Sequence, residues 1–310
     1  MPDEFDELTQ ERFEEMLGPP VSVDGIDQET DDGRIDGIVF ELYKEAACVV
    51  SVTAHLLDDS ASAKGGLSRN QAICAGLLVR ITKLMLVVTQ LGATGNRSEP
   101  VMVLSRCIME SAVNLEFLAH KNEDRFYDQF VKLSLGPERE LYDQIRGNIV
   151  ARNGVMLPIE SRILSRIENL CRVSGVKITD VDRKPGDWGG GVRERLKALG
   201  KEHRYVSMQR TPSHAVHGTW VDLFTSHLEY NATTATFAPD TTFAVVDSRA
   251  LGPIARLVLE AVCGYLDKFF AHTTPYGVIK ARLDDLQARL WIADNMHEKL
   301  YGAKWQKAHQ

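Results

Sequence analysis

Cysteine is scarce in this sequence. Its 310 residues hold five cysteines, which is an odd number, and no two of them form a CxxC pair. They are scattered along the chain at Cys48, Cys74, Cys107, Cys171 and Cys263. Such a set argues against a disulfide framework and against a cysteine-based zinc site. We therefore expect reduced thiols in the core of a cytoplasmic protein.

The sequence also lacks the patterns of targeting and membrane-spanning segments. Its first residues are acidic, whereas a secretory signal begins with basic residues and continues with an apolar run. The most apolar stretch, residues 72–91, is interrupted by Arg80 and Lys83. These charges favour a core helix over a membrane span, so we expect no membrane partner.

Several common catalytic signatures are absent as well. The sequence has no GxSxG elbow and no internal repeat. The glycine run GDWGGG at residues 186–191 precedes the basic residues RERLK, and no Lys-Ser or Lys-Thr follows it as in a P-loop. We interpret residues 186–191 as a flexible linker.

Charge is unevenly distributed. The formal net charge of −7 argues against a general nucleic-acid binder. Residues 1–45 contain fifteen acidic and three basic residues, whereas residues 146–210 contain fourteen basic and seven acidic residues. The simpler interpretation is an acidic N-terminal extension over residues 1–33 and a solvated basic helix face. A second hypothesis is that the extension docks on the 146–210 face of its own chain or of a dimer partner.

The hydrophobic periodicity predicts a mostly α fold, a multi-helix bundle formed by one domain over residues 34–310. Long helices are expected at residues 36–57, 69–91, 98–120, 248–272 and 278–301. Shorter helices are expected at residues 3–17, 124–150 with an interruption at 136–137, 158–173, 192–199, 202–210 and 211–229. Between residues 232 and 246, Thr, Phe and Val alternate around a Pro-Asp pair. This pattern predicts one small β-hairpin or irregular arm.

The stretch from residue 205 to residue 220 gathers the most side chains capable of chemistry. It contains Arg210, Ser213, His214 and His217. Thr211 and Pro212 predict a helix start, with Thr as the cap and Pro in the first turn. The free N–H groups of such a start attract anions, of which phosphate is the most usual.

These residue types suggest roles at a phosphodiester. Arg210 offers a guanidinium fork for phosphate, and His217 or His214 offers a general base. A metal-dependent hydrolase is an alternative, because two histidines three residues apart share a helix face, but two ligands do not complete a metal site. A third interpretation is a non-catalytic interaction or ligand-sensing module. In it, these polar side chains only form hydrogen bonds with one another at a helix junction.

Arg106, Glu110 and Asn114 lie four residues apart in an otherwise apolar helix. A partly buried charge needs polar partners, and the 205–217 stretch is the best supply of them. We therefore expect Arg106 and Glu110 to lie within contact distance of this stretch. Asn114 joins them in a ligand-binding or structural polar network.

Four short motifs carry a family resemblance. They are RCIMESAVNLEFL from Arg106, the pair Trp188-Gly189, Tyr205, and the run from Ser213 to Gly218 with the pattern Ser-x-x-x-His-Gly. Over roughly residues 35–270 the chain resembles a bacterial family of helical proteins of unknown function. That family is similar to HEPN domains, the helical bundles of toxin and phage-defence ribonucleases. In HEPN domains an Arg shortly precedes a His, and here six residues separate Arg210 from His217.

The resemblance implies metal-independent RNA cleavage by 2′-hydroxyl attack at a homodimer interface. RNA and a second copy of the chain are then the expected partners, with no cofactor and no metal. Arg210 would bind phosphate and His217 would transfer a proton, oriented by Ser213 and Glu110. The remaining candidates are His214 in catalysis and, in ligand binding, Arg106, Asn114, Trp188 and Tyr205. The sequence departs from the HEPN pattern where Thr211-Pro212 follows the arginine.

Overall fold

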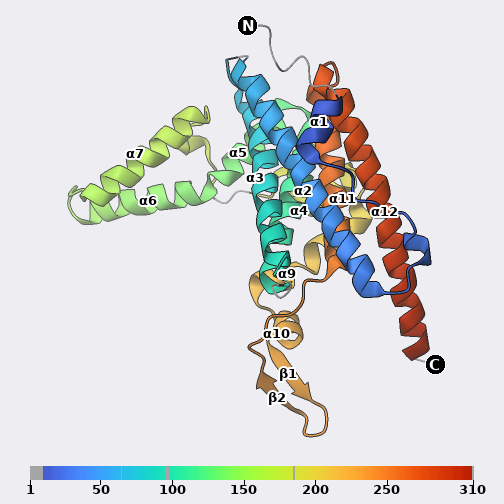
Figure 1. The fold of residues 1–310 in the computed structure, drawn as a ribbon. Helices are drawn as coiled ribbons and strands as arrows, with labels where there is room; N and C mark the ends of the chain where they lie inside the picture. Colours follow the sequence, from blue (N-terminus) through green and yellow to red (C-terminus); the bar gives the residue numbers. More distant parts are fainter. Residues whose placement is uncertain (1–9, 64, 95–97, 184–185, 309–310) are drawn as a thin grey trace.

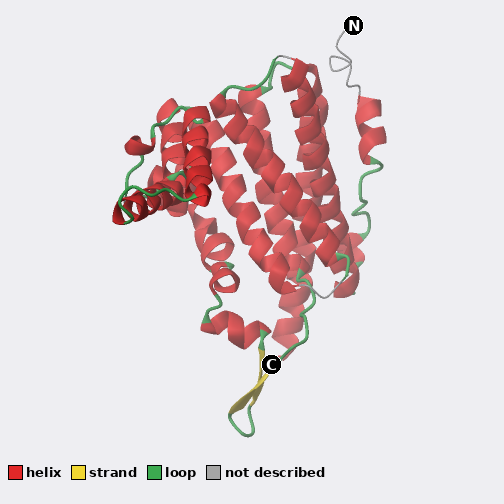
Figure 2. Cartoon of the chain, turned by 90° about the vertical axis from the view of Figure 1, so that its left-hand side faces the viewer, coloured by secondary structure: helices red, strands yellow, loops and turns green. Residues whose placement is uncertain are grey.

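The computed structural model describes residues 10–63, 65–94, 98–183 and 186–308. This part is mostly helical and has one two-stranded antiparallel hairpin, as the sequence predicts (Figures 1 and 2). The helices are α1 Gln10–Leu17, α2 Asp32–Ala63, α3 Arg69–Gly92, α4 Ser98–Lys121, α5 Asp124–Ser134, α6 Gly136–Ala151, α7 Pro158–Val173, α8 Gly191–Ala198, α9 Ser213–His217, α10 Trp220–Ser226, α11 Ser248–Phe269 and α12 Thr274–Ala308. The strands are β1 Leu228–Asn231 and β2 Thr236–Pro239.

Five long helices, α2, α3, α4, α11 and α12, form the bundle (Figure 1). Helix α4 packs against α3 and α11, and α2 packs against α3, α11 and α12. Apolar side chains at three- and four-residue spacing give each helix a buried face. Helix α3 is also long and apolar enough to cross a membrane. In the structure its Leu78, Ile81 and Met85 lie buried in the bundle core.

The N-terminal segment packs on the bundle. Phe13 of α1 and Ile26 of the following turn are buried in the main core. Helix α1 contacts α2 and α12, and the turn Ile26–Gln28 contacts α12. For residues 10–28, docking on the 146–210 face of the same chain is therefore wrong, because two apolar anchors outweigh screened attraction between surface charges. Docking on that face of a dimer partner stays a prediction. The first part of the expected helix 3–17, residues 1–9, lies outside the described residues.

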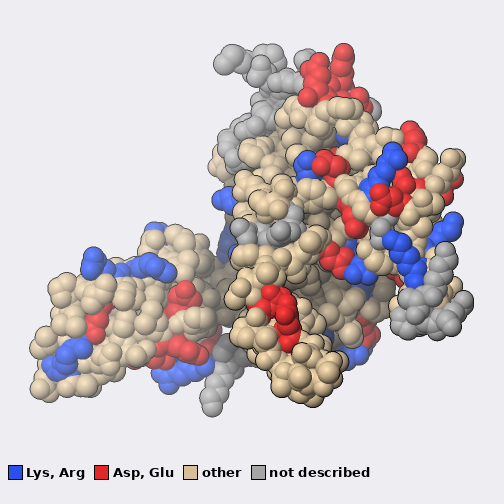
Figure 3. Space-filling view, turned by 60° about the horizontal axis from the view of Figure 1, so that its bottom comes forward, with Lys and Arg blue, Asp and Glu red and all other residues tan. Residues whose placement is uncertain are grey.

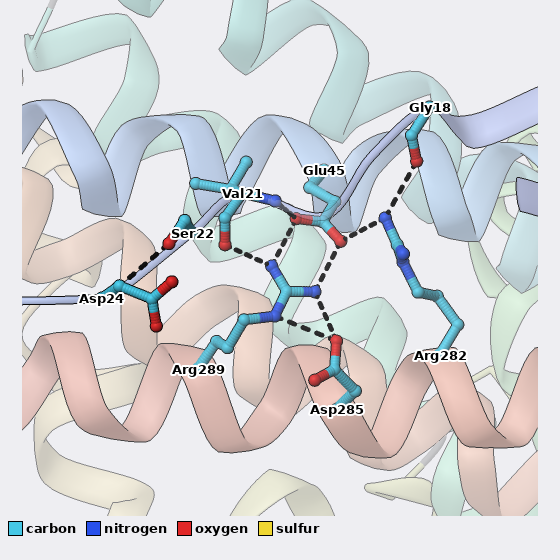
Figure 4. A network of polar contacts seen from close by, with 8 residues as sticks. All are labelled: Gly18, Val21, Ser22, Asp24, Glu45, Arg282, Asp285 and Arg289. Carbon is cyan, nitrogen blue, oxygen red and sulfur yellow. Dashed lines mark hydrogen bonds and ion pairs between the residues drawn. The ribbon is translucent and has the colours of Figure 1, made fainter.

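A buried ion network fixes this segment (Figure 4). The carboxylate of Glu45 on α2 accepts hydrogen bonds from Arg289 at 2.6 Å through each oxygen, and it lies 2.8 Å from Arg282. The backbone N–H of Val21 donates to the same carboxylate at 2.9 Å, and Arg289 donates to the Val21 carbonyl. The three charged side chains are 5–9% exposed. The network joins α2, α12 and the chain around Val21.

Helices α6 and α7 form a hairpin that projects away from the bundle (Figure 1). The expected interruption at residues 136–137 is confirmed, since α5 ends at Ser134 and α6 begins at Gly136 with Pro137 in its first turn. At the far end of the hairpin, the loop between the helices contains Asn153 and Gly154 with positive φ.

The five cysteines are free thiols. Cys74, Cys171 and Cys263 are buried, and burial raises the pKa of Cys74 and of Cys263 to about 11. Cys48 is exposed and Cys107 is half-buried. The expectation of core thiols is therefore wrong for Cys48, which lies on the solvent side of α2.

Candidate functional site

A polar strip runs along α4 and meets the segment that contains Ser213. Arg106 Nη1 lies 2.8 Å from Glu110 Oε2, and Arg106 Nε donates to Ser213 Oγ at 3.4 Å. Ser213 Oγ in turn donates to the Gln209 carbonyl at 2.6 Å. Asn114 follows one turn further along α4 and is buried. We call Arg106, Glu110, Asn114 and Ser213 the α4 strip. The expected contact is confirmed for Arg106, while Glu110 is linked to the segment through Arg106.

The backbone before Ser213 differs from the expected helix start. Residues 206–210 form a π-helix, and Thr211 and Pro212 both have right-handed helical angles. The Thr211 N–H donates to the Val206 carbonyl at 3.0 Å. Thr211 is therefore not a cap, and the predicted anion site at a free helix start is wrong. Proline lacks an N–H and clashes with a carbonyl of the preceding turn, and the wider π turn relieves this conflict.

The expected helix 211–229 is also wrong, because it breaks after one turn and a half. Gly218 has φ of 56°, the left-handed conformation that ends many helices, and it separates α9 from α10. The chain then enters β1 at Leu228. His214 Nδ1 lies 2.7 Å from Thr219 Oγ1, so a residue just after the helix break positions the His214 imidazole.

Arg210 and His217 lie at the two ends of this short segment. Both side chains are exposed. Neither makes a hydrogen bond, an ion pair or a ring contact with another described residue. The residue between them, Ser213, is anchored to α4. The segment thus offers a guanidinium and an imidazole to a ligand, and their catalytic role stays a prediction.

The glycine run covers part of α4 and is an ordered loop. Trp188 is 7% exposed and packs edge-to-face on Phe117 and Phe130, with ring centroids at 5.7 and 5.1 Å. Glycines 189, 190 and 191 have φ of 58°, 75° and 87°, which side chains disfavour. The interpretation of residues 186–191 as a flexible linker is wrong, because these angles turn the chain so that Trp188 enters the core. Trp188 therefore offers little surface to a ligand.

Arg195 is a site residue that the sequence analysis missed. It is 2% exposed, stacks 4.1 Å from the Trp188 ring centre and donates to the Trp188 carbonyl at 2.7 Å. Burial lowers the pKa of Arg195 to about 10, although Glu110 and Asp187 favour its charge. Its Nε and the Oδ1 of Asn114 are both buried without a protein partner among the described residues. The only signal in the sequence was the basic run after the glycines.

Six of the fourteen basic residues of the stretch 146–210 form ion pairs with described residues. Lys201 Nζ lies 2.7 Å from Glu116 and 2.6 Å from Glu260, and Arg204 binds Glu260 at 2.7 Å. Burial raises the pKa of Glu260, but hydrogen bonds from Arg204 and Lys201 outweigh it and hold the pKa below its ordinary value. Other pairs are Arg152–Glu160, Arg183–Asp143 and Arg193–Glu202. Basic and acidic side chains alternate on the face shown in Figure 3, so this face carries no continuous basic surface.

Tyr205 and the histidine pair complete the candidates. Tyr205 is half-buried, and the Arg193 guanidinium lies 5.8 Å from its ring centre. Within the described ranges, no group of three His, Cys, Asp or Glu residues could hold a metal ion. Among the described residues, His214 and His217 therefore have no His, Cys, Asp or Glu close enough to act as a third metal ligand.

The residues of the site fall within one family match. No curated protein and no solved structure matches the chain. The model of a family of unknown function, DUF5677, matches residues 71–233. This range is more than half of the chain, and it includes most of α3, all of α4, the α6–α7 hairpin and the complete α4 strip. The chain therefore belongs to the DUF5677 family of unknown function.

Proposed function

We propose that the protein binds RNA beside the α4 strip and that Arg210 and His217 contact the phosphate backbone. The observation that carries the proposal is that both side chains are exposed and form no hydrogen bond or ion pair with a described residue. They lie on a segment anchored by the Arg106–Ser213 contact. Many cations nearby are already paired with carboxylates. A cation that no carboxylate neutralises is available to a polyanion.

The chemistry proposed for the pair is that of an HEPN-like endoribonuclease of the toxin or phage-defence type. Arg210 holds the phosphate, and neutral His217 removes the proton of the 2′-hydroxyl. The 2′ oxygen attacks the adjacent phosphorus, and the bond to the 5′ oxygen breaks. The protonated imidazole returns the proton to the leaving oxygen. The products are a 2′,3′-cyclic phosphate and a 5′-hydroxyl end.

Cleavage of a mixed-sequence RNA by the purified full chain, with and without chelator, tests the proposal. His217→Ala should slow cleavage about 10²–10⁴-fold, since it removes the proton-transfer group. Arg210→Ala should weaken both RNA binding and cleavage. Matched controls are His120→Ala and Arg172→Ala, which remove an exposed histidine and an exposed arginine away from the strip. Circular dichroism checks that each variant stays folded.

A non-catalytic binding module is the second candidate. One observation favours it: no described residue orients the His217 ring through a hydrogen bond, an ion pair or a ring contact. This candidate predicts RNA binding that Arg210→Ala weakens, without cleavage by the wild type. Cleavage that a chelator abolishes would instead favour a metal-dependent hydrolase that uses His214 and His217. A wild-type protein that neither binds nor cleaves RNA contradicts the proposal.

A further inference from the structure

The segment from residue 218 to residue 245, which we call the aromatic arm, exposes its aromatic side chains. Helix α10 and the β1–β2 hairpin project from the bundle (Figures 1 and 2). Trp220, Phe224, Tyr230 and Phe237 are 44–58% exposed, and their rings contact one another at centroid distances of 4.9 to 6.4 Å. No side chain between residues 219 and 245 is buried. A two-stranded hairpin is marginally stable alone, so a partner on this surface would stabilise it.

The charge of the aromatic arm indicates the kind of partner. The arm contains no Lys or Arg and has three acidic residues, Asp222, Glu229 and Asp240. Phosphates of a nucleic acid or an anionic membrane would be repelled by such a surface. A protein surface that combines exposed apolar side chains with basic ones is complementary to it.

The end of the α6–α7 hairpin has these properties. Its apolar side chains Val150, Val155, Met156, Leu157 and Ile159 are 42–76% exposed, and we call residues 150–159 the helical tip. Residues 146–166 contain four arginines and one acidic residue, Glu160. Glu160 pairs with Arg152 and accepts the Leu157 N–H, which fixes the loop. The other three arginines, Arg146, Arg162 and Arg166, make no ion pair with a described residue.

Within one molecule the helical tip and the aromatic arm point in different directions, so they do not cover one another (Figure 1). We propose that the helical tip of one copy docks on the aromatic arm of a second copy. The contact buries the exposed rings against the apolar tip and places acidic residues near unpaired arginines. Because the two surfaces differ, a reciprocal pair of such contacts closes a dimer, and non-reciprocal contacts form larger assemblies. This proposal does not depend on the RNA-binding proposal.

The oligomeric state of the full chain tests the proposal by sedimentation velocity, over concentrations that extend to about 100 μM. The arm variant is Phe237→Asp, and the tip variant is Val155→Asp. The control Val173→Asp replaces a valine that is as exposed as Val155 but lies at the other end of α7. We expect the wild type and the control to associate, and each of the other variants to be monomeric. Mixing the arm and tip variants should restore a complex, because one intact tip still meets one intact arm.

A second pair of substitutions keeps the test valid if a variant folds poorly. Glu229→Lys on the arm and Arg162→Glu in the first turns of α7, beside the tip, reverse exposed charges. Each should weaken association about tenfold or more, and the double variant should recover part of the loss. A monomeric wild type overturns the proposal. So does association that survives the tip substitutions but not the arm substitutions, which would indicate arm-to-arm contact. A mixture of the two Asp variants that stays monomeric also overturns it.

Discussion

Two clusters of arginine and glutamate lie on long helices of the bundle, and their surroundings differ. In the cluster of Glu45, Arg282 and Arg289, each side chain is less than a tenth exposed, and four donors converge on the Glu45 carboxylate. In the α4 strip, the Arg106 side chain is 15% and the Glu110 side chain 43% exposed. Among the described residues, Arg195 Nε and Asn114 Oδ1 beside that pair are buried without a partner, and so is Arg282 Nε in the first cluster.

The difference separates a structural role from a binding role. A buried carboxylate whose oxygens are all occupied by donors has no capacity left for a ligand, and it holds together the chain segments that supply the donors. A pair that is open to solvent on one side keeps capacity for another molecule. The same residue types therefore predict stability at the first cluster and recognition at the second.

Removal of the central carboxylate of the buried cluster should have the largest effect. Glu45→Ala leaves two buried guanidinium groups without their partner and frees the Val21 N–H. We expect a loss of about 3–5 kcal/mol in the free energy of unfolding, measured by urea denaturation. The control Glu41→Ala, which removes an exposed carboxylate paired with Lys44, should change it by about 0.5 kcal/mol or less. Equal losses in the two variants would contradict a structural role for the cluster.

The glycine loop at residues 186–191, which packs on Phe117 of α4, should respond to a side chain at Gly189. A Cβ there would lie 3.1 Å from Arg195 Cγ and 3.3 Å from Phe117, in a backbone of positive φ. We expect Gly189→Ala to cost about 1–2 kcal/mol in unfolding free energy and to increase the solvent exposure of Trp188, seen as a red shift of its fluorescence. The control is Gly186→Ala, where no atom lies within 4 Å of the added carbon. If both variants behave alike, the loop does not depend on its glycine angles.

The smallest effect on stability is expected at Glu110. Because Glu110 is nearly half exposed, Glu110→Gln should lower the unfolding free energy by about 1 kcal/mol or less. The same change removes the ion pair that positions Arg106 toward Ser213, so RNA binding should weaken more than stability does. Glu45→Gln provides the comparison, with a large loss of stability. A Glu110→Gln protein as unstable as Glu45→Gln would make the strip a structural cluster like the first.

Much of the architecture was predictable because it depends on local periodicity. Apolar residues at helical spacing predicted the long helices, and Gly136-Pro137 marked the break between α5 and α6. The β-hairpin was expected near residues 232–246 and lies slightly earlier, at residues 228–239. A partly buried arginine needs polar partners, and this requirement correctly predicted the contact between Arg106 and the 205–217 stretch.

By itself, then, the sequence determined the helix faces and the presence of polar groups that need partners, since these follow from residue spacing and the cost of burying charge. Only the tertiary structure decided which partners they found. It enclosed Trp188 and Arg195 over α4, converted the turn before Pro212 into a π-helix and joined Glu45 to arginines some 240 residues away. These outcomes depend on contacts between distant segments, whose geometry no local pattern specifies.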